Sequence, residues 1–236
     1  MFTRRSFKKM IKALVNSFGY EINKLRPVDT NNGFEMYRYR KPDGTFDYEK
    51  YQQIQVAGNK RKIESVWVLE ENISFLSDYI NKNIANVEFG LCHGTRRGKE
   101  QEWFRKYLNC DVIGTEISDT AGQFPYTIQW DFHKVKPEWI DAVDFIYSNS
   151  FDHSYDPQRC LNAWMSCVEK GGICILEHTS GHERATKLDP FGADISQMPY
   201  LILTWGEGKF CVREVLNAPS KPDSLKYIQY LIIQRL

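Results

Sequence analysis

The spacing of hydrophobic positions along the chain changes near residue 85. Before that point, the apolar residues between 66 and 80 recur every three or four positions, which predicts an amphipathic helix. Residues 28–62 carry turn residues and predict an irregular cap that leads into a helix over 47–56. After residue 85, short apolar runs alternate with helical stretches, a pattern typical of repeated βαβ units in a parallel sheet.

The second part of the chain is predicted to form a Rossmann-like α/β fold with a mostly parallel seven-stranded sheet and helices on both faces. Gly171 and Gly172 follow Lys170 and provide a helix stop. After residue 198 the helical spacing is lost, so two β-rich runs are expected to form an antiparallel strand pair at one edge. The predicted strands are 86–90, 111–116, 126–129, 144–148, 172–177, 200–215 and 225–233, and the predicted helices are 97–108 and 156–169.

The N-terminal segment has a pattern of its own. Residues 3–18 place Phe7, Ile11, Leu14 and Phe18 at helical spacing, and basic residues lie mainly off that stripe. Such a helix packs on protein, either its own domain or a second copy of the chain, or lies on an anionic membrane surface. The expected organisation is a basic extension over 1–27, a cap with a leading helix over 28–84, and an α/β core over 85–236.

The amino-acid composition restricts the classes of function that the chain can have. The 236 residues are 42% hydrophobic and 26% charged with a net charge of +1, which indicates a globular protein and argues against a nucleic-acid partner. The six cysteines include no Cys-x-x-Cys pair, so we expect reduced thiols in a cytoplasmic protein. No apolar run reaches the roughly 18 residues of a membrane span, so we expect at most a peripheral contact with the inner face of the membrane.

The first predicted strand ends in a glycine-containing segment. Gly90 and Gly94 permit a close backbone approach to a ligand, while Cys92 stands where the dinucleotide fingerprint has its middle glycine. Glu88 would repel a pyrophosphate and suits a ligand that carries an ammonium group. His93 is interpreted as a cofactor contact or a solvent-facing residue. Taken alone, Glu88 is also consistent with a helix cap or a lysine partner, and the loop with an ordinary turn.

Two further strand ends carry side chains suited to an adenosine. Glu116 ends the second predicted strand, about 20 residues after the glycine loop, where a carboxylate accepts hydrogen bonds from a ribose diol. Ile117 follows it and is assigned to the same site. After the third strand, Asp131 can accept from an adenine amino group and Phe132 can stack on the ring. Asp131 alone is equally typical of a turn.

The fourth strand is followed by the polar residues 148–153. Ser148 and Asn149 lie at the carboxyl end of that strand, where open α/β sheets bind ligands. Asn149 and His153 are also suited to holding the loop and capping the next helix.

These residues in this order resemble class I S-adenosylmethionine-dependent methyltransferases. The match covers about residues 85–180 and departs from the family at Cys92, where the family prefers glycine. Its motifs are Glu88-x-Gly90-x-Cys92-x-Gly94, Glu116, Asp131, residues 148–153 and Lys170-Gly171-Gly172. The resemblance implies S-adenosylmethionine as the cofactor, contacted by Glu88, Gly90, Cys92, His93, Gly94, Glu116, Ile117, Asp131, Phe132, Ser148 and Asn149. A weaker similarity over 18–21 and 55–60 to methyltransferases encoded with surface-polysaccharide genes implies a glycan or other small acceptor.

Methyl transfer requires alignment of donor and acceptor and, for a hydroxyl acceptor, a base. The candidates are His153, His178 and His182, and the acceptor pocket is expected over 177–193 with residues 47–62 as a lid. His178 and His182 stand four apart, but the intervening Thr179-Ser180-Gly181 disfavours a helix, so we expect no metal site there. The competing hypotheses are an NAD-dependent oxidoreductase, which would share Glu116, and a non-catalytic methyltransferase-like docking module.

Overall fold

The computed structural model describes residues 28–31 and 33–236. The extension over 1–27 lies outside the described residues, and with it the helix expected over 3–18 and its membrane or dimer contact. None of the helices in the described part of the chain combines the length and the apolar character that a membrane span requires.

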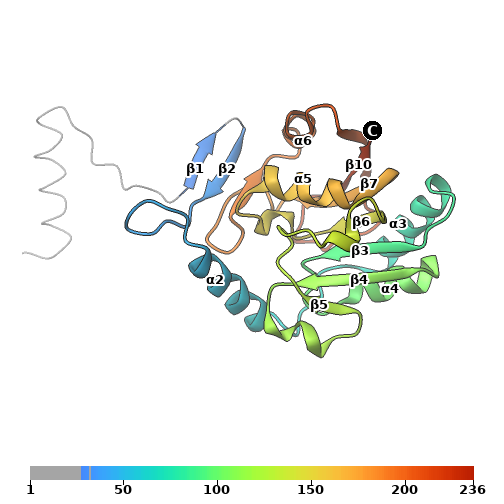
Figure 1. Cartoon of the computed structure of the whole chain (residues 1–236), viewed down its shortest axis with the longest axis horizontal. Helices are drawn as coiled ribbons and strands as arrows, with labels where there is room; N and C mark the ends of the chain where they lie inside the picture. Colours follow the sequence, from blue (N-terminus) through green and yellow to red (C-terminus); the bar gives the residue numbers. More distant parts are fainter. Residues whose placement is uncertain (1–27, 32) are drawn as a thin grey trace, which may run out of the picture.

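A seven-stranded sheet forms the centre of the fold, with the strand order β5-β4-β3-β6-β7-β10-β9 (Figure 1). The five strands from β5 to β7 are parallel, whereas β10 runs antiparallel to both of its neighbours. This confirms the predicted mostly parallel sheet with an antiparallel terminal pair. The strands are Phe89–His93 (β3), Asp111–Glu116 (β4), Thr127–Gln129 (β5), Val143–Ser148 (β6), Val168–Thr179 (β7), Phe210–Asn217 (β9) and Ile228–Arg235 (β10).

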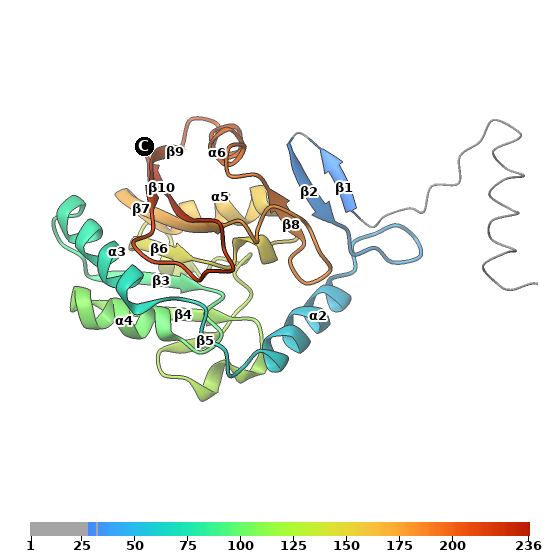
Figure 2. The ribbon, with the colours of Figure 1, turned by 180° about the vertical axis from the view of Figure 1, so that it is seen from behind.

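Helices cover both faces of this sheet (Figure 2). Because successive side chains of a strand point to opposite faces, Leu91 of β3 packs in the core with α5 and α6, and the next residue, Cys92, packs in the core with α3 and α4. Each large apolar side chain buried in this way contributes about 1.5–3 kcal/mol to folding. The helices are α3 (Glu70–Asn83) and α4 (Lys99–Leu108) on one face, and α5 (Pro157–Cys167) and α6 (Met198–Gly206) on the other.

A small second sheet was not expected from the sequence. It contains β1 (Val28–Asn31), β2 (Phe34–Tyr37) and β8 (Phe191–Ala193), paired antiparallel in the order β1-β2-β8. The rings of Phe34 and Phe191 each lie 6.0 Å from the ring of Trp205 in α6, which joins this sheet to the main core. Strands of three or four residues are too short to show a reliable alternation, so the segment resembled an irregular cap.

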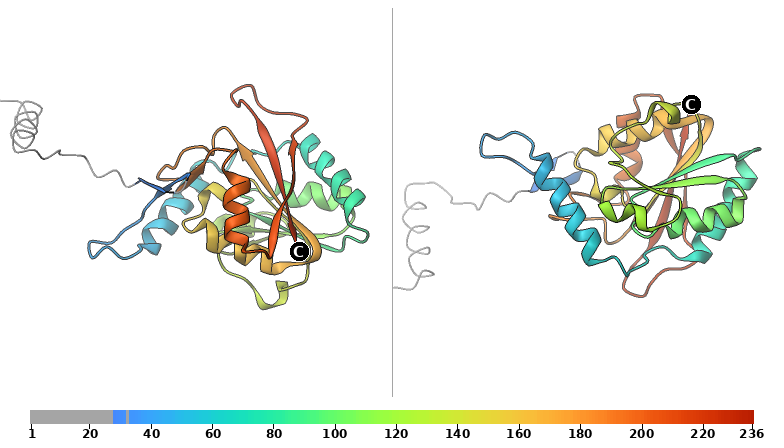
Figure 3. Two further views of the ribbon diagram at one scale, coloured as in Figure 1. Left: turned by 90° about the horizontal axis from the view of Figure 1, so that it is seen from above. Right: turned by 60° about the horizontal axis from the view of Figure 1, so that its bottom comes forward.

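Helix α2 (Tyr48–Arg61) follows the small sheet and lies beside the loops at the carboxyl ends of the parallel strands (Figure 3). It begins as predicted near residue 47, where the Asp47 side chain accepts from the backbone N–H of Lys50. It continues five residues beyond the predicted end at 56. Three short 3₁₀ turns complete the described elements: Asp119–Gln123 (η1), Pro137–Trp139 (η2) and Phe151–His153 (η3).

The β-rich run predicted over 200–215 is wrong in its first half, where the chain forms α6. Leu201, Ile202 and Trp205 are buried at helical spacing, but Tyr200 and Leu203 on the outer side are also apolar. A helix that is apolar on its exposed side shows no amphipathic period, so its sequence resembles that of a buried strand.

Candidate functional site

The turn that carries the glycines begins at Gly94, four residues after Gly90, where the sequence analysis began it. Strand β3 ends at His93, and residues 94–98 form the turn into α4. Gly94, Arg96 and Gly98 all have positive φ, at 77°, 43° and 72°. A Cβ at Gly94 would lie 2.6 Å from the Cβ of Ser150, so only glycine fits this approach of two loops. Gly94 therefore takes the place that the sequence analysis gave to Gly90.

Because the turn begins at Gly94, Glu88 does not lie beside it. Glu88 is exposed and precedes β3, at the opposite end of the strand from Gly94. Its backbone N–H donates to the Asp144 carboxylate, and it lines a surface depression with Arg105 and Cys110. The expectation that Glu88 contacts the same ligand as Gly94 is thus corrected, because the length of β3 separates them.

Three other predicted contacts are structural in this fold. Gly90 lies inside β3, where a Cβ would come within 2.3 Å of the Phe145 ring. Cys92 is fully buried in the core under α3 and α4, and burial raises the pKa of its thiol. The His93 ring is buried 4.6 Å from that of Trp164, and its Nδ1 lies 2.9 Å from the Thr115 hydroxyl. None of these three residues lines the crevice.

Glu116 lies where the sequence placed it, at the end of β4, and lines the crevice together with Ile117 and Gly94. One carboxylate oxygen accepts from the backbone N–H of Arg96 at 3.1 Å and the other from that of Ser118 at 3.0 Å. Burial raises the pKa of Glu116, and these backbone hydrogen bonds oppose the shift. Each oxygen has accepted one described hydrogen bond and retains capacity for another, which matches the two hydroxyls of a ribose diol.

Asp131 and Phe132 also line this part of the crevice. Asp131 accepts from the Tyr48 hydroxyl at 2.7 Å and lies 2.8 Å from His133 Nδ1. Burial alone would raise the pKa of Asp131, but its hydrogen bonds with His133 and Tyr48 outweigh burial and lower it. The carboxylate is therefore held ionised with its acceptor capacity partly used, whereas Phe132 contributes an aromatic ring to the lining of the crevice.

Beyond β6, some residues of the segment that begins at Ser148 hold the loop in place, and others line the crevice. Ser148 is buried, and its hydroxyl donates to the His93 carbonyl at 2.9 Å, so it holds the loop and does not line the crevice. The Ser150 hydroxyl donates to the Gly94 carbonyl at 3.1 Å. Asn149 does line the crevice, and its amide donates to the Glu100 carboxylate at 3.3 Å.

Glu100 was missed by the sequence analysis. It lies in the first turn of α4, is buried, and lines the crevice between Gly94 and Asn149. Burial raises the pKa of this carboxyl to about 7, against 4.5 for a free glutamate. An acidic residue in the first turn of a helix is ordinary, so the sequence carried no signal that this one is enclosed.

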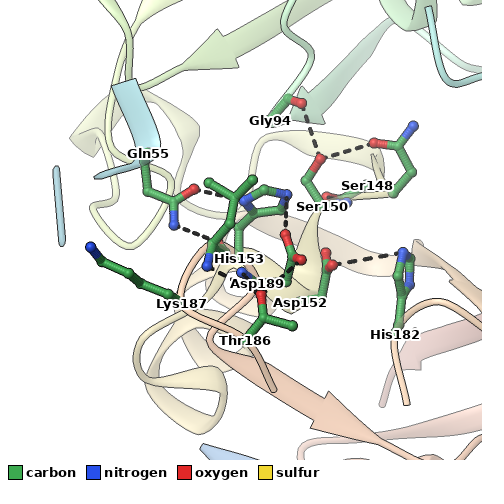
Figure 4. A network of polar contacts seen from close by, with 12 residues as sticks. Gln55, Gly94, Ser148, Ser150, Asp152, His153, His182, Thr186, Lys187 and Asp189 are labelled. Carbon is green, nitrogen blue, oxygen red and sulfur yellow. Dashed lines mark hydrogen bonds and ion pairs between the residues drawn. The ribbon is translucent and has the colours of Figure 1, made fainter. Parts of the chain in front are cut away.

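Helix α2 closes one side of the crevice, where the sequence analysis expected a cap. Tyr51, Gln55 and Asn59 of this helix are buried against it. The Gln55 amide nitrogen donates to the Leu188 carbonyl at 2.7 Å, and its amide oxygen lies 2.6 Å from His153 Nδ1 (Figure 4). Gln55 therefore fixes His153 relative to the segment that follows β7.

The second part of the crevice contains two of the candidate histidines together with two aspartates, one from the polar segment 148–153 and one from the segment 177–193 expected to form the acceptor pocket. His153 Nε2 lies 3.6 Å from an Asp189 oxygen, and His182 Nε2 lies 3.8 Å from an Asp152 oxygen. Figure 4 shows the four side chains side by side, drawn from the loop after β6 and the segment after β7. We call Asp152, His153, His182 and Asp189 the histidine–aspartate cluster.

Burial sets the charge states within this cluster. It raises the pKa of Asp152 to about 6, with His153 lowering and Asp189 raising it further, and it lowers the pKa of His182 to about 4. His178 is not part of the cluster. Its Nε2 lies 3.0 Å from the Ala193 carbonyl and its Nδ1 3.4 Å from the Tyr227 hydroxyl, and it does not line the crevice. Of the three candidate bases, His153 and His182 line the crevice, and His178 lies behind them with its ring 5.5 Å from that of His182.

Several solved methyltransferase structures share this fold. The 1,6-didemethyltoxoflavin-N1-methyltransferase of Burkholderia thailandensis, solved with its namesake ligand and S-adenosylhomocysteine, aligns over 88% of this chain and 98% of that one, with a TM-score of 0.63 and 11% identity. Magnesium protoporphyrin IX methyltransferase from Synechocystis PCC 6803, with bound S-adenosylmethionine, aligns over 97% of both chains, with a TM-score of 0.51 and 11% identity.

A plantazolicin methyltransferase in complex with a triazolic desmethylPZN analog and S-adenosylhomocysteine aligns over 79% of this chain and 97% of that one, with a TM-score of 0.58 and 12% identity. No protein-family profile and no curated protein sequence matches the chain. The fold implied by the sequence resemblance is therefore confirmed, and at these identities the likeness concerns the fold.

Proposed function

We propose that the chain is an S-adenosylmethionine-dependent methyltransferase that acts on a small-molecule acceptor. The observation that carries this proposal is the convergence of Gly94, Glu116 and Phe132, from three successive strand ends, on one crevice. This convergence supplies a close backbone approach, a diol acceptor and an aromatic face, which are the features an adenosine requires. The neighbours crystallised with S-adenosylmethionine or S-adenosylhomocysteine on the same fold support the same cofactor.

The two ends of the crevice suit the two ends of this cofactor. Glu116 and Ile117 would hold the ribose and adenine, and Glu100 with Asn149 would face the amino-acid end, where a buried carboxylate pairs with an ammonium group. When bound, the cofactor supplies an electrophilic methyl group on a sulfonium. Glu100 thus takes the role that the sequence analysis assigned to Glu88.

The acceptor would enter beside the histidine–aspartate cluster. His153 lines both parts of the crevice, so a molecule bound against it lies between the adenosine side and the cluster. Helix α2 and residues 180–190 would exclude water from this region once both ligands are bound. The expectation of a glycan acceptor, and with it a place in surface-polysaccharide biosynthesis, stays a prediction of the sequence similarity.

Two features weigh against the nicotinamide hypothesis. A dinucleotide fold continues its parallel sheet beyond the fifth strand, whereas here β10 and β9 close the edge antiparallel. The middle position of the glycine loop is occupied by Arg96. The docking-module hypothesis predicts that neither cofactor binds.

Calorimetric titration separates these three functions. We expect S-adenosylmethionine and S-adenosylhomocysteine to bind with one site per chain at micromolar dissociation constants, and NAD to give no heat of binding. Binding of NAD in place of the sulfonium cofactor would reject the methyltransferase, and the absence of any nucleotide binding would favour the docking module.

Replacing Gly94 by alanine is expected to weaken S-adenosylhomocysteine binding about tenfold. The new Cβ would meet Ser150 at 2.6 Å, and the φ of +77° costs about 1–2 kcal/mol for a residue with a side chain. Gly122→Ala is the matched control, since a Cβ at that position meets no atom of the described residues within 4 Å. Equal affinity of the Gly94→Ala and Gly122→Ala proteins, measured by calorimetry, would show that the loop does not approach the ligand.

A further inference from the structure

The histidine–aspartate cluster has the spacing of a cation site. Ligand atoms of Asp152, His153 and Asp189 all lie within 4.8 Å of one another. Two donors on opposite sides of a divalent ion, each about 2.1 Å away, are about 4.2 Å apart. Small side-chain rotations would therefore bring the three donors to bonding distance of one ion. His182 Nε2 lies next to this group, 3.8 Å from the Asp152 carboxylate.

The hydrogen bond between Gln55 and His153 determines which ring nitrogen of His153 carries the proton and which one is an acceptor. The Gln55 amide nitrogen is used in donating to Leu188, so its oxygen is the group that faces His153 Nδ1. Nδ1 must then carry a proton and donate it, which leaves a lone pair on Nε2 in the neutral ring. That lone pair points toward the Asp189 carboxylate at 3.6 Å. Two acceptors in this arrangement repel each other unless a proton or a metal cation lies between them.

The aspartates present free acceptor capacity at the same place. Asp152 is 7% exposed, and its Oδ1 has no hydrogen-bond partner among the described residues. An orphaned buried carboxylate oxygen is costly, and a cation is the ligand that satisfies it best. Asp189 is anchored by its other oxygen, which accepts from the Thr186 hydroxyl at 3.0 Å, so its Oδ1 remains directed at His153.

We propose that Asp152, His153 and Asp189 bind one divalent first-row transition-metal ion. The two carboxylates balance the charge of a divalent ion. Imidazole nitrogen together with carboxylate oxygen favours Mn²⁺, Fe²⁺ or Zn²⁺ over Mg²⁺ or Ca²⁺, which prefer oxygen donors alone. Gln55 is then a positioning residue, since it holds His153 in the tautomer that ligates through Nε2.

The site lies beside the crevice in which the acceptor would bind, so the ion would contact the acceptor; this role rests on the proposed function. His153 lines the adenosine side of the crevice as well as the side with His182 and Asp189. An ion held there would have an open position directed into the crevice and would bind an oxygen atom of the acceptor. The acceptors that fit this chemistry carry a hydroxyl, a carboxylate or two adjacent oxygens.

The test is direct metal binding by the full chain after treatment with a chelator. Titration with Mn²⁺, followed by electron paramagnetic resonance, is expected to give one site per chain with a micromolar dissociation constant. Asp152→Asn and Asp189→Asn are each expected to weaken it at least tenfold. Asp111→Asn, an exposed position paired with Arg105 at the other end of the sheet, is the matched control and should leave it unchanged. The same titration with Zn²⁺ is expected to raise the melting temperature of the wild-type chain.

Two results would overturn the proposal. One is the absence of Mn²⁺ and Zn²⁺ binding to the wild-type chain at millimolar concentration. The other is equal binding by the two cluster variants and the control, which would identify an adventitious ion only. If a cluster variant fails to fold, the spin-echo spectrum of Mn²⁺ on the wild-type chain decides, since coupling to imidazole nitrogen is required. A separate titration with S-adenosylhomocysteine keeps this failure distinct from failure of the proposed function, because cofactor binding without metal binding rejects the metal site alone.

Discussion

Glu116→Ala is expected to weaken S-adenosylhomocysteine binding by at least about 100-fold. A hydrogen bond to an ionised group contributes about 1.5–3 kcal/mol, and the variant loses two such bonds to the ribose diol. It also leaves the backbone N–H groups of Arg96 and Ser118 without their present acceptor, so the loop that carries Arg96 loses a fixed point. Calorimetric titration at constant pH measures the loss.

A second variant at the same position, Glu116→Gln, is expected to have a smaller effect on cofactor binding. Glu116→Gln keeps the shape of the side chain and one acceptor oxygen, so we expect an intermediate loss of about tenfold. Glu138→Ala, at an exposed position beside Lys136, serves as the matched control and is expected to bind normally. If Glu116→Ala bound as tightly as Glu138→Ala, the carboxylate at the end of β4 would have no part in cofactor binding.

Most of the sheet could be predicted because its parallel strands are short apolar runs that end in turn signals. The bounds predicted for β4, residues 111–116, are those observed, and β6 begins one residue earlier than expected. Glu116 and Phe132 line the crevice because the carboxyl ends of parallel strands meet at one edge, which the strand positions in the sequence indicate. Their contact with the cofactor stays a prediction.

The glycine loop was placed in the wrong register for a physical reason. Gly90 stands one residue after the apolar Phe89 and resembles the first glycine of a binding loop, but it lies inside β3, where the Phe145 ring leaves no space for a Cβ. The true loop reads Gly94-x-Arg96-x-Gly98, and Arg96 adopts a positive φ that usually belongs to glycine. A non-glycine residue at that position hides the motif.

The sequence predicted an acceptor pocket over 177–193 with His153 as a candidate base, but it did not predict the pairing of Asp189 with His153 inside that pocket. Asp189 comes close to His153 only because the segment that carries it is tied down from several sides. The Tyr39 hydroxyl donates to the Lys187 carbonyl at 2.6 Å, and Gln55 holds Leu188. These contacts depend on the small β1-β2-β8 sheet and on α2, two elements whose relative placement no local pattern encodes. His178 and His182 stand four apart in the sequence, but His178 does not line the crevice, and its Nε2 lies 3.0 Å from the Ala193 carbonyl.

Glu100→Gln is expected to have opposite effects on stability and on cofactor binding. Burial raises the pKa of Glu100 from 4.5 to about 7, so its contribution to stability is fully present below pH 4.5 and is lost as the pH rises through about 7. At pH 8 the wild-type chain therefore carries the cost of a buried charge, which glutamine removes. We expect Glu100→Gln to be more stable by on the order of 2 kcal/mol at pH 8, a rise in melting temperature of about 5 °C.

The same charge is what the ammonium group of the cofactor would pair with, so Glu100→Gln should bind S-adenosylhomocysteine about 30-fold more weakly at pH 8. At pH 6 the wild-type carboxyl is largely protonated, and both differences should shrink. Calorimetry and thermal unfolding at the two pH values measure them, with the exposed Glu102→Gln on the same helix as the control. A lower melting temperature of Glu100→Gln at pH 8 would contradict the buried charge. A cofactor affinity equal to that of the wild-type chain at pH 8 would show instead that the ammonium group binds elsewhere, because an enclosed carboxylate that pairs with a cation must lose affinity when it loses its charge.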